Sequence, residues 1–309
     1  MTSQPSQRIT LAGFIITLLG AIFFSTKAII VKLAFQDTKV DALTLLTLRM
    51  LFSLPFYILA IWLGARKEKA TPLSTKQWLQ VAVTGILGYY LSSLFDFIGL
   101  QYVSAGLERL ILFLYPTFAV LINTFLFKSP LHRTQVIALL LTYTGIGIAY
   151  AGELHADTSA PGFFYGSFMI FLCAVTYSLY LVGTGRLVNK TGATRYTAYT
   201  MMAATAGIFI HFALTKPLSS ISFTPALTGY SIALAIVATV LPSFMMSNGM
   251  KRIGSNNVAI ITSIGPVSTI LQAYYILGEP LLPLQLFGTF LVIVGVLIIG
   301  RKAGKEQAA

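Results

Sequence analysis

Two stretches of the chain, separated by 150 residues, decide the fold. The first covers residues 107–130 and reads LERLILFLYPTFAVLINTFLFKSP, and the second covers residues 257–280 and reads NVAIITSIGPVSTILQAYYILGEP. At this offset residues 106–151 align with residues 256–301 without a gap, and nine of the 46 positions are identical. Since apolar helices match one another by chance, the Leu and Ile identities carry little weight. The identities that indicate an internal repeat are Pro116 with Pro266, Pro130 with Pro280, Gln135 with Gln285 and Gly145 with Gly295.

Around these stretches the chain consists of apolar runs long enough to cross a bilayer. Of its 309 residues 56% are apolar and 10% are charged, whereas a soluble domain is about 25% charged, so a water-soluble globule is excluded. A bilayer-crossing helix needs about 20 mostly apolar residues. Interruptions by charge or by Pro, Gly and Ser clusters divide the chain into ten predicted spans: 11–33, 42–63, 79–99, 107–127, 134–151, 162–184, 196–215, 227–248, 257–277 and 283–300.

Each half of the chain then contains five spans, the first five in residues 1–151 and the second five in residues 152–309. Because five is an odd number, the second half enters the membrane with the opposite orientation to the first. The predicted fold is an all-α membrane protein of ten transmembrane helices in two inverted five-helix repeats. In many secondary transporters this arrangement places the substrate near the membrane midplane, between the two halves.

The distribution of Lys and Arg predicts the orientation of the chain. With a cytoplasmic N-terminus, fifteen of the 21 Lys and Arg residues fall in inner segments, Lys39 and Lys216 fall in outer loops, and four fall within or at the ends of spans. This bias follows the positive-inside rule. We therefore expect a multi-pass protein of the cell (inner) membrane with both termini in the cytoplasm. The net charge of +12 reflects this placement in the lipid bilayer, and no nucleic-acid partner is expected.

The spans and the repeat, together with GLQYVSAG at residues 99–106 and GEPL at residues 278–281, resemble the drug/metabolite transporter (DMT) superfamily and its EamA-type ten-span branch. The resemblance implies a carrier that is a monomer or weak dimer, with a central cavity lined by spans 1–4 and 6–9 and with spans 5 and 10 at the periphery. Arg49 matches a position where the family often carries Arg, and Glu279 matches the acidic residue expected before the tenth span. The first half departs from this pattern with Ser129, where the repeat predicts an acid.

Charged side chains within or at the ends of spans gather in the outer part of the first half: Lys27, Arg49, Asp96, Glu108 and Arg109. An ionisable group at mid-bilayer costs about 2.5 to 3.5 kcal/mol on insertion scales, so these groups are functional candidates. In one interpretation the two acids and the two arginines neutralise one another and hold helix ends together. In another they form a polar vestibule for substrate or a coupling proton, and an anionic group of the substrate pairs with the one unmatched positive charge. A third interpretation lets Lys27 and Lys32 reach the lipid headgroups.

Uncharged polar side chains extend a candidate substrate path deeper into the membrane. Arg109, Pro116 and Asn123 are spaced by seven residues and share one helix face, on which Pro116 frees a backbone carbonyl. For each polar side chain the alternative is a hydrogen bond between packed helices. Pro116, Pro266 and Glu279 are expected to have structural roles. The remaining candidates for substrate contact or coupling are Tyr90, Tyr177, Tyr180, Ser243, Asn248 and Gln272.

Several kinds of chemistry lack their sequence signals. The chain has three scattered histidines and one cysteine, Cys173, and it contains neither an H-E-x-x-H pair nor a G-x-x-x-x-G-K-[ST] loop, so no enzyme activity, metal or other cofactor is expected. A carrier without an ATP site must use a gradient or an exchange partner. The prediction is a secondary transporter that exports small metabolites such as amino acids, organic anions or drugs by alternating access, with protons coupled through Asp96 or Glu108. The alternatives are a channel or facilitative pore and an intramembrane enzyme.

Overall fold

The computed structural model describes residues 10–67, 73–127, 133–156, 161–262 and 264–306, which form helices joined by short turns, with no strand among them. The expected all-α fold is confirmed for this part of the chain. The first half contributes α1 (Leu11–Thr38), α2 (Ala42–Lys67), α3 (Thr75–Gly85), the π-helical turn η1 (Ile86–Leu91), α4 (Ser92–Gly99), α5 (Ala105–Leu112), α6 (Tyr115–Phe127) and α7 (Arg133–Ala156). The second half contributes α8 (Phe163–Thr191), α9 (Ala193–Thr215), the 3-10 turn η2 (Leu218–Ser220), α10 (Pro225–Ala235), the π-helical turn η3 (Ile236–Val240), α11 (Leu241–Thr262), α12 (Gly265–Gln272), the π-helical turn η4 (Ala273–Leu277) and α13 (Pro283–Glu306).

Several helix bounds of the two halves recur at an offset of 150 residues, among them those of α3 and α10. The α7 and α13 helices begin at Arg133 and Pro283 and both contain 24 residues. The π-helical turns η1 and η3 begin at Ile86 and Ile236, directly after α3 and α10. The repeat found in the sequence therefore has a counterpart in the positions of the helices, including the position of an uncommon π-helical turn.

A break interrupts the corresponding helix in both halves. The α5–α6 break is followed by Pro116 and the α11–α12 break by Pro266, in each case one residue into the next helix. Proline has no N–H group, so the carbonyl four residues earlier in the helix loses its usual donor. The expected freeing of a backbone carbonyl near Pro116 agrees with this break.

One expected loop is helical instead. We predicted that residues 249–256 separate spans 8 and 9, and this prediction is wrong because α11 continues through them to Thr262. Those residues contain no proline, so each retains an N–H group for the helix. The interruption comes later, at the start of α12 beside Pro266.

Among the described residues, six helical segments are long and apolar enough to cross a membrane: Leu11–Thr38, Ala42–Leu63, Thr75–Gly99, Phe163–Thr184, Thr194–Thr215 and Pro225–Met246. They correspond to predicted spans 1–3 and 6–8. Predicted spans 4 and 9 contain the two breaks, and the stretch Pro283–Gly295 within span 10 is a shorter apolar helix. A protein that crosses the membrane several times is thus supported, and the count of ten spans stays a prediction.

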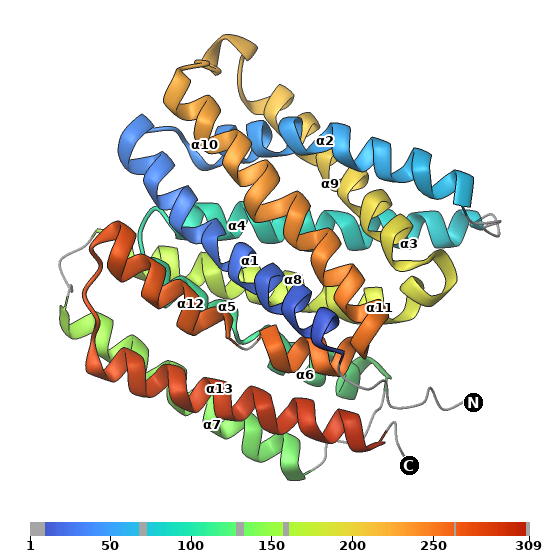
Figure 1. The fold of residues 1–309 in the computed structure, drawn as a ribbon. Coiled ribbons are helices and arrows are strands. Elements are labelled where there is room, and N and C mark those ends of the chain that lie inside the picture. Colours follow the sequence, from blue (N-terminus) through green and yellow to red (C-terminus); the bar gives the residue numbers. More distant parts are fainter. Residues whose placement is uncertain (1–9, 68–72, 128–132, 157–160, 263, 307–309) are drawn as a thin grey trace.

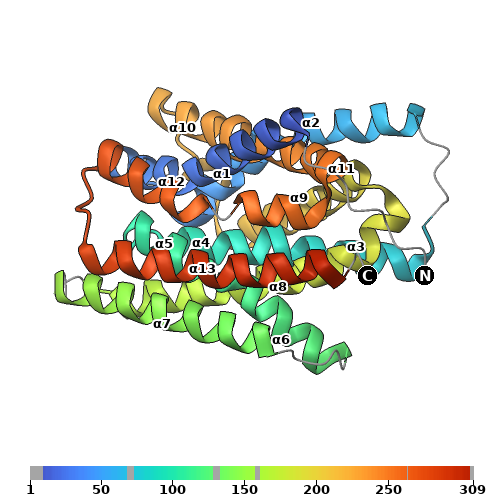
Figure 2. The same cartoon turned by 60° about the horizontal axis from the view of Figure 1, so that its bottom comes forward.

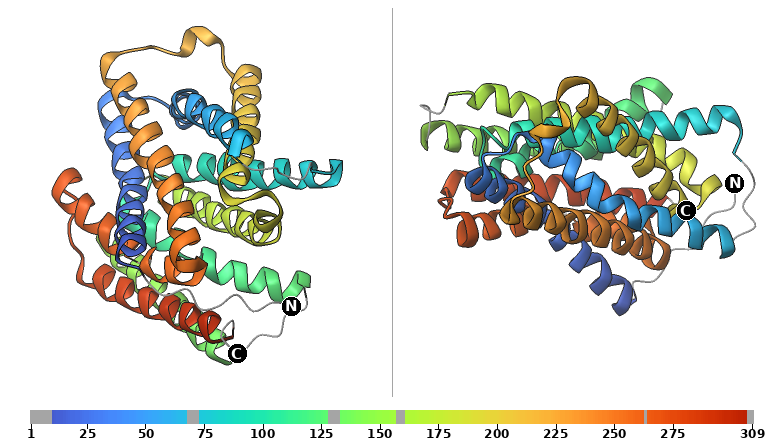
Figure 3. Two further views of the ribbon diagram at one scale, coloured as in Figure 1. Left: turned by 45° about the vertical axis from the view of Figure 1, so that its right-hand side comes forward. Right: turned by 90° about the horizontal axis from the view of Figure 1, so that it is seen from above.

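Helices from opposite halves lie side by side throughout the bundle. The α1 helix packs against α11, α2 against α9, and α4 against α8, as Figures 1 and 3 show. The α7 and α13 helices pack together along their lengths and form one edge of the bundle (Figures 1 and 2). Their backbones approach closely at Gly145, where an added Cβ would lie 2.6 Å from the carbonyl oxygen of Gly288.

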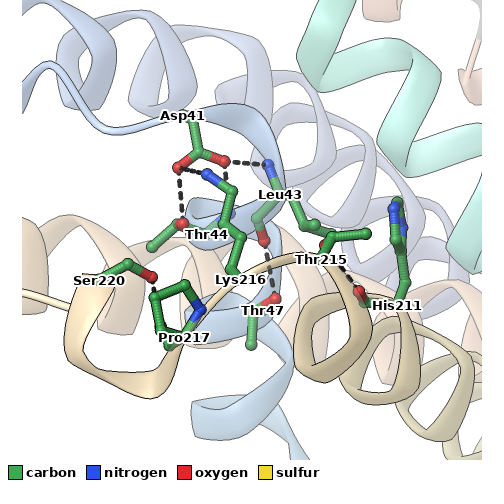
Figure 4. A network of polar contacts seen from close by, with 9 residues as sticks. All are labelled: Asp41, Leu43, Thr44, Thr47, His211, Thr215, Lys216, Pro217 and Ser220. Carbon is green, nitrogen blue, oxygen red and sulfur yellow. Dashed lines mark hydrogen bonds and ion pairs between the residues drawn. The ribbon is translucent and has the colours of Figure 1, made fainter.

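Polar caps mark the helix ends outside the bundle core. Asp41 precedes α2, and its Oδ1 atom accepts hydrogen bonds from the N–H groups of Leu43 and Thr44, each at 3.1 Å. Its Oδ2 atom lies 2.6 Å from Thr44 Oγ1 and 2.5 Å from Lys216 Nζ, which follows α9 (Figure 4). Burial alone would raise the pKa of Asp41, but the hydrogen bonds to Lys216 and Thr44 outweigh it and lower the pKa. Asp41 therefore caps α2 and ties it to the end of α9.

Candidate functional site

Three charged side chains meet between α1, α4 and α5. Lys27 Nζ lies 2.7 Å from Asp96 Oδ2 and 3.7 Å from Glu108 Oε1. All three residues are buried, Asp96 and Glu108 completely and Lys27 to within 7% exposure. We call Lys27, Asp96 and Glu108 the charge triad. Because isolated buried charges are very costly, the triad requires that the three helices stay together or that a proton or ligand replaces a partner.

The triad corrects one interpretation of Lys27. A lysine that extends to the headgroups would leave its ammonium exposed, but Lys27 is buried and paired with Asp96. The interpretation that Lys27 reaches the headgroups is therefore wrong. Lys27 is buried because Asp96 and Glu108 lie on helices packed against α1, so two carboxylates inside the protein pair with its ammonium group.

The two carboxyl groups of the triad share a single cation. Each has an oxygen within 4 Å of Lys27 Nζ, and neither oxygen pair has a further hydrogen-bond donor within the described residues. In that part of the chain, no ion pair within 4 Å joins Arg49 or Arg109 to Asp96 or Glu108. The expected mutual neutralisation of two acids by two arginines therefore takes a different form, in which Lys27 is the direct partner of both acids.

Arg49 links the two halves of the chain. It projects from α2 and is buried, its Nε atom donating to Thr239 Oγ1 of η3 at 2.8 Å and its Nη1 atom to Ser93 Oγ of α4 at 3.4 Å. The guanidinium also lies over the ring of Phe97, 5.5 Å from its centre. These contacts give the buried guanidinium two neutral hydrogen-bond acceptors and an aromatic face.

The π-helical turn supplies the acceptor for Arg49. Within η3, Thr239 Oγ1 donates to the carbonyl of Leu234, five residues earlier, at 2.8 Å. Its oxygen remains able to accept from Arg49. Ser93 follows η1, the corresponding π-helical turn of the first half. Sequence reasoning missed Thr239 and Ser93, because a hydroxyl residue in an apolar helix is common and nothing local indicates its partner.

Arg109 lies on α5, beside Glu108 in the chain but apart from the triad's ion pairs. The Arg109 side chain is buried, and its guanidinium lies 5.6 Å from the ring centre of Phe24 and 5.7 Å from that of Phe113. Its Nε atom has no hydrogen-bond partner in the described part of the chain. A buried guanidinium that retains an unused donor between two aromatic rings has capacity for an additional acceptor.

Glu279 connects the end of the ninth predicted span to α5. Its carboxylate accepts from the N–H groups of Ala105 at 2.9 Å and Gly106 at 3.4 Å. These are the first residues of α5, where an anion interacts favourably with the helix dipole. Ser104 caps the same helix by accepting from the N–H of Leu107 at 3.0 Å. Glu279 thus holds the helix that carries Glu108 and Arg109, while Ser129, its repeat mate, lies outside the described residues.

Tyr177 and Tyr180 of α8 belong to a cluster of aromatic rings. The ring of Tyr177 lies 5.2 Å from that of Tyr115, centre to centre, and the rings of Tyr180 and Tyr89 are 4.9 Å apart. The hydroxyl groups of Tyr89 and Tyr180 are 3.1 Å apart and form a hydrogen bond. Ser243 of α11 pairs with Tyr57 of α2 at 3.2 Å. Sequence reasoning identified Tyr177, Tyr180 and Ser243 but missed the partner rings, because helical spacing does not reveal which faces meet.

The remaining candidates lie away from the triad. Tyr90 pairs with His211 Nδ1 at 2.8 Å, and Gln272 donates to Ser268 of its own helix at 2.9 Å. Asn248 is exposed and accepts from Arg252 Nε at 3.1 Å. The hydrogen bonds of these three candidates do not involve the triad. Such bonds are typical of packed membrane helices. The side chains of Asn123 and Pro116 lie outside the described residues.

An all-helical bundle with several membrane-spanning segments and buried charges between its helices is the architecture of a membrane transporter. The sequence model of the EamA-like transporter family matches residues 11–151 and 164–301, and the chain belongs to this family. The expected resemblance to EamA-type transporters is confirmed.

Individual relatives agree with the family assignment. The "Uncharacterized transporter YcbK" of Bacillus subtilis (strain 168) is 31% identical over 314 residues, which cover 98% of each chain. The "Uncharacterized transporter YyaM" of the same organism is 26% identical over 76% of this chain and 79% of its own. A solved crystal structure of a protein shares the fold with a TM-score of 0.67 and 20% identity, covering 94% of this chain and 98% of that one.

Proposed function

We propose that the protein is a secondary transporter that exports small metabolites, such as amino acids, organic anions or drugs, across the cell (inner) membrane. In this proposal ten spans form two inverted five-helix repeats, residues 1–151 and 152–309, that alternate in opening to either side. Its partners are a small-molecule substrate, the lipid bilayer and protons, and it acts as a monomer or weak dimer without a cofactor. Membership of the EamA-like transporter family supports the general role.

The recurrence of helix bounds at an offset of 150 residues carries the proposal of two repeats. Both halves place a π-helical turn directly after the helix that begins at Thr75 or Pro225, and both have a break before a proline. In Figure 1 the α1–α2 and α12–α13 connections lie at the left of the bundle, and the α8–α9 connection lies at the right. The end of α2 and the start of α3 also lie at the right. Alternation of this kind is what repeated membrane crossings by successive helices require.

Polar contacts between the two halves support alternating access. Arg49 of the first half bonds Thr239 of the second, and Glu279 of the second half holds the start of α5 in the first. Ser25 Oγ also lies 3.3 Å from the carbonyl oxygen of Gly265. Buried hydrogen bonds of this kind can exchange partners when the halves rock against each other. We propose that these contacts rearrange during each transport cycle.

We propose further that Asp96 and Glu108 couple transport to protons. The two acids share the ammonium of Lys27, which lies 2.7 Å from Asp96 and 3.7 Å from Glu108, so their pairing depends on the packing of α1 against α4 and α5. Movement of α1 relative to α4 and α5 would separate Lys27 from the acids and change the number of protons that they hold. Substrate movement and proton movement would then be linked through the same three helices.

Flux through the purified protein in liposomes tests the proposed function. We expect saturable flux of a small metabolite that is accelerated by counter-substrate, whereas a channel would show neither saturation at low concentration nor counterflow. An imposed pH gradient should drive flux in the parent protein but not in Asp96→Asn or Glu108→Gln. If flux through the parent protein does not depend on the pH gradient, proton coupling is refuted, and substrate exchange or facilitated diffusion remains as the mechanism.

A further inference from the structure

The α12 helix begins inside the protein and without a side-chain cap. Its first two residues, Gly265 and Pro266, are buried, and within the described residues no side chain accepts a hydrogen bond at its N-terminus. A helix N-terminus carries a partial positive charge that favours an anion. By contrast, Ser104 and Glu279 satisfy the N-terminus of α5. The start of α12 is therefore a buried positive end without an acidic side chain bonded to it in the described part of the chain.

The guanidinium of Arg109 is aimed at this same point. A Cβ atom added to Gly265 would lie 3.1 Å from Arg109 Nε and 3.2 Å from its Cζ atom, so the guanidinium rests directly on the first residue of α12. Glycine permits this approach because it has no side chain at that position. The guanidinium thus lies beside the first turn of α12, and both are buried. The unused donor Nε lies at this contact.

The neighbouring acids are committed to another partner. Asp96 and Glu108 are paired with Lys27, and neither forms an ion pair within 4 Å of Arg109. The rings of Phe24 and Phe113 flank the guanidinium and limit its access to water. An anion that enters here would gain a charge-assisted hydrogen bond from Arg109 and the dipole of α12, both strengthened by the low local dielectric.

We propose that Arg109 and the N-terminus of α12 bind the carboxylate of the transported molecule, so that the substrates are small organic acids. This inference rests on the proposed transport function and names the substrate class of the same site. The first half supplies the arginine and the second half supplies the helix end, so the bound carboxylate would bridge the two halves. Substrate binding would therefore favour a conformation in which α5 and α12 stay together.

A flux panel with matched pairs tests the substrate class. Benzoate, lactate, succinate and glutamate are each compared with the corresponding amide in liposomes that contain the full chain. We expect saturable flux of at least one acid and no saturable flux of its amide. The Arg109→Gln variant should raise the half-saturating concentration of that acid about 10- to 100-fold, as expected for a lost hydrogen bond to a charged group.

Two further variants separate binding from folding. Gly265→Ala keeps Arg109 but places a methyl group against its guanidinium, and it should also raise the half-saturating acid concentration at least tenfold. Arg252→Gln changes an exposed arginine of α11 and serves as the matched control, with parent-like flux expected. Arg109→Lys retains the charge and should weaken acid flux less than Arg109→Gln.

The outcomes distinguish the two proposals. Saturable flux of neutral or cationic compounds, or acid flux that Arg109→Gln and Gly265→Ala leave unchanged, would overturn the carboxylate site while the transport function stands. Saturable flux of none of the compounds, including the amides, amino acids and cationic drugs added to the panel, would contradict the proposed transport function itself.

Discussion

The two halves of this protein share their helices but not their charges. Helix bounds recur at an offset of 150 residues, yet the residues equivalent to Lys27, Arg49, Asp96, Glu108 and Arg109 in the second half are Tyr177, Tyr199, Met246, Val258 and Ala259. The second half instead contributes the hydroxyl of Thr239, the carboxylate of Glu279 and the start of α12. The comparison teaches that positions of helices can correspond in the two halves although the buried Lys, Arg and acidic side chains of the site lie in the first half.

Opposite orientation of the two halves predicts an all-or-none difference between two repeat mates. Lys76 and Ala226 occupy the second position of α3 and α10, and both are exposed. In a Cys173→Ala background, Ala226→Cys should react with an impermeant thiol reagent from outside the cell, and Lys76→Cys should react only after the membrane is opened. Labelling of both positions from the same side would break the inverted-repeat proposal.

Replacement of Lys27 should lower the stability of the protein far more than replacement of Tyr177, the equivalent residue of the second half. Lys27→Met leaves two buried carboxyl groups without a cation and should cost about 3 to 5 kcal/mol, as breaking a buried ion pair does. Tyr177→Phe keeps the packing with Tyr115 and should cost less than about 1 kcal/mol. Thermal unfolding midpoints in detergent measure both variants.

A double variant checks the cause of this effect. Adding Asp96→Asn to Lys27→Met removes one of the unpaired charges, so the double variant should be more stable than Lys27→Met alone. Equal stability of the single and double variants would show that the charge triad contributes little, and the contrast between the halves would lose its energetic basis.

Replacement of Arg49 should cost less stability than replacement of Lys27, but its effect on transport should differ clearly from that of replacing Tyr199, the equivalent residue of the second half. Arg49→Gln loses the hydrogen bonds to Thr239 and Ser93 and should cost about 1.5 to 3 kcal/mol for bonds to a charged group, while abolishing transport. Its mate Tyr199 accepts from Arg195 at 3.0 Å on α9, and Tyr199→Phe should leave flux within about twofold of the parent. Liposome flux normalised to monodisperse protein measures this difference, and full activity of Arg49→Gln would remove Arg49 from the mechanism.

The smallest effect concerns how the mated helices α2 and α9 begin. Asp41 caps α2, whereas α9 begins after Gly192 without a side-chain cap. The pKa of Asp41 is lowered in the folded state, despite its burial, by its hydrogen bonds to Lys216 and Thr44. Its contribution to stability is therefore present above the pKa of an unfolded aspartate, about 3.9, and is lost as the pH falls through the lower folded pKa.

The parent and Asp41→Asn should accordingly differ in unfolding midpoint at pH 7 by a small margin, and this difference should shrink as the pH falls below about 3.9. The margin is small because the carboxylate is partly solvated. A difference that grows on acidification would contradict this assignment. The same titration of Thr191→Ala, at the repeat mate of Asp41, should show no such pH dependence.

Several features of this protein could be predicted because their signals are local. Hydropathy alone predicted the helical membrane class, and in-register prolines predicted the repeat that the helix bounds now parallel. The charged residues in the outer part of the first half could be identified because a charge within an apolar stretch is visible in the sequence, whichever helices pack against it. The family followed from the same diffuse pattern and is confirmed.

Only the tertiary structure decided which of these groups meet. Lys27 pairs with acids 69 and 81 positions later in the chain, and Arg49 bonds a threonine whose separation in the chain is 190 residues. No local pattern encodes such pairs, since they depend on which helix faces pack together and on the register shift at a π-helical turn. For the same reason Lys27, which one of three interpretations placed at the headgroups, is buried instead, and Gly265 became a site residue only when α5 and α12 were brought together. The sequence determined which helices form and which side chains are costly in a membrane, whereas packing determined the partners that make them tolerable.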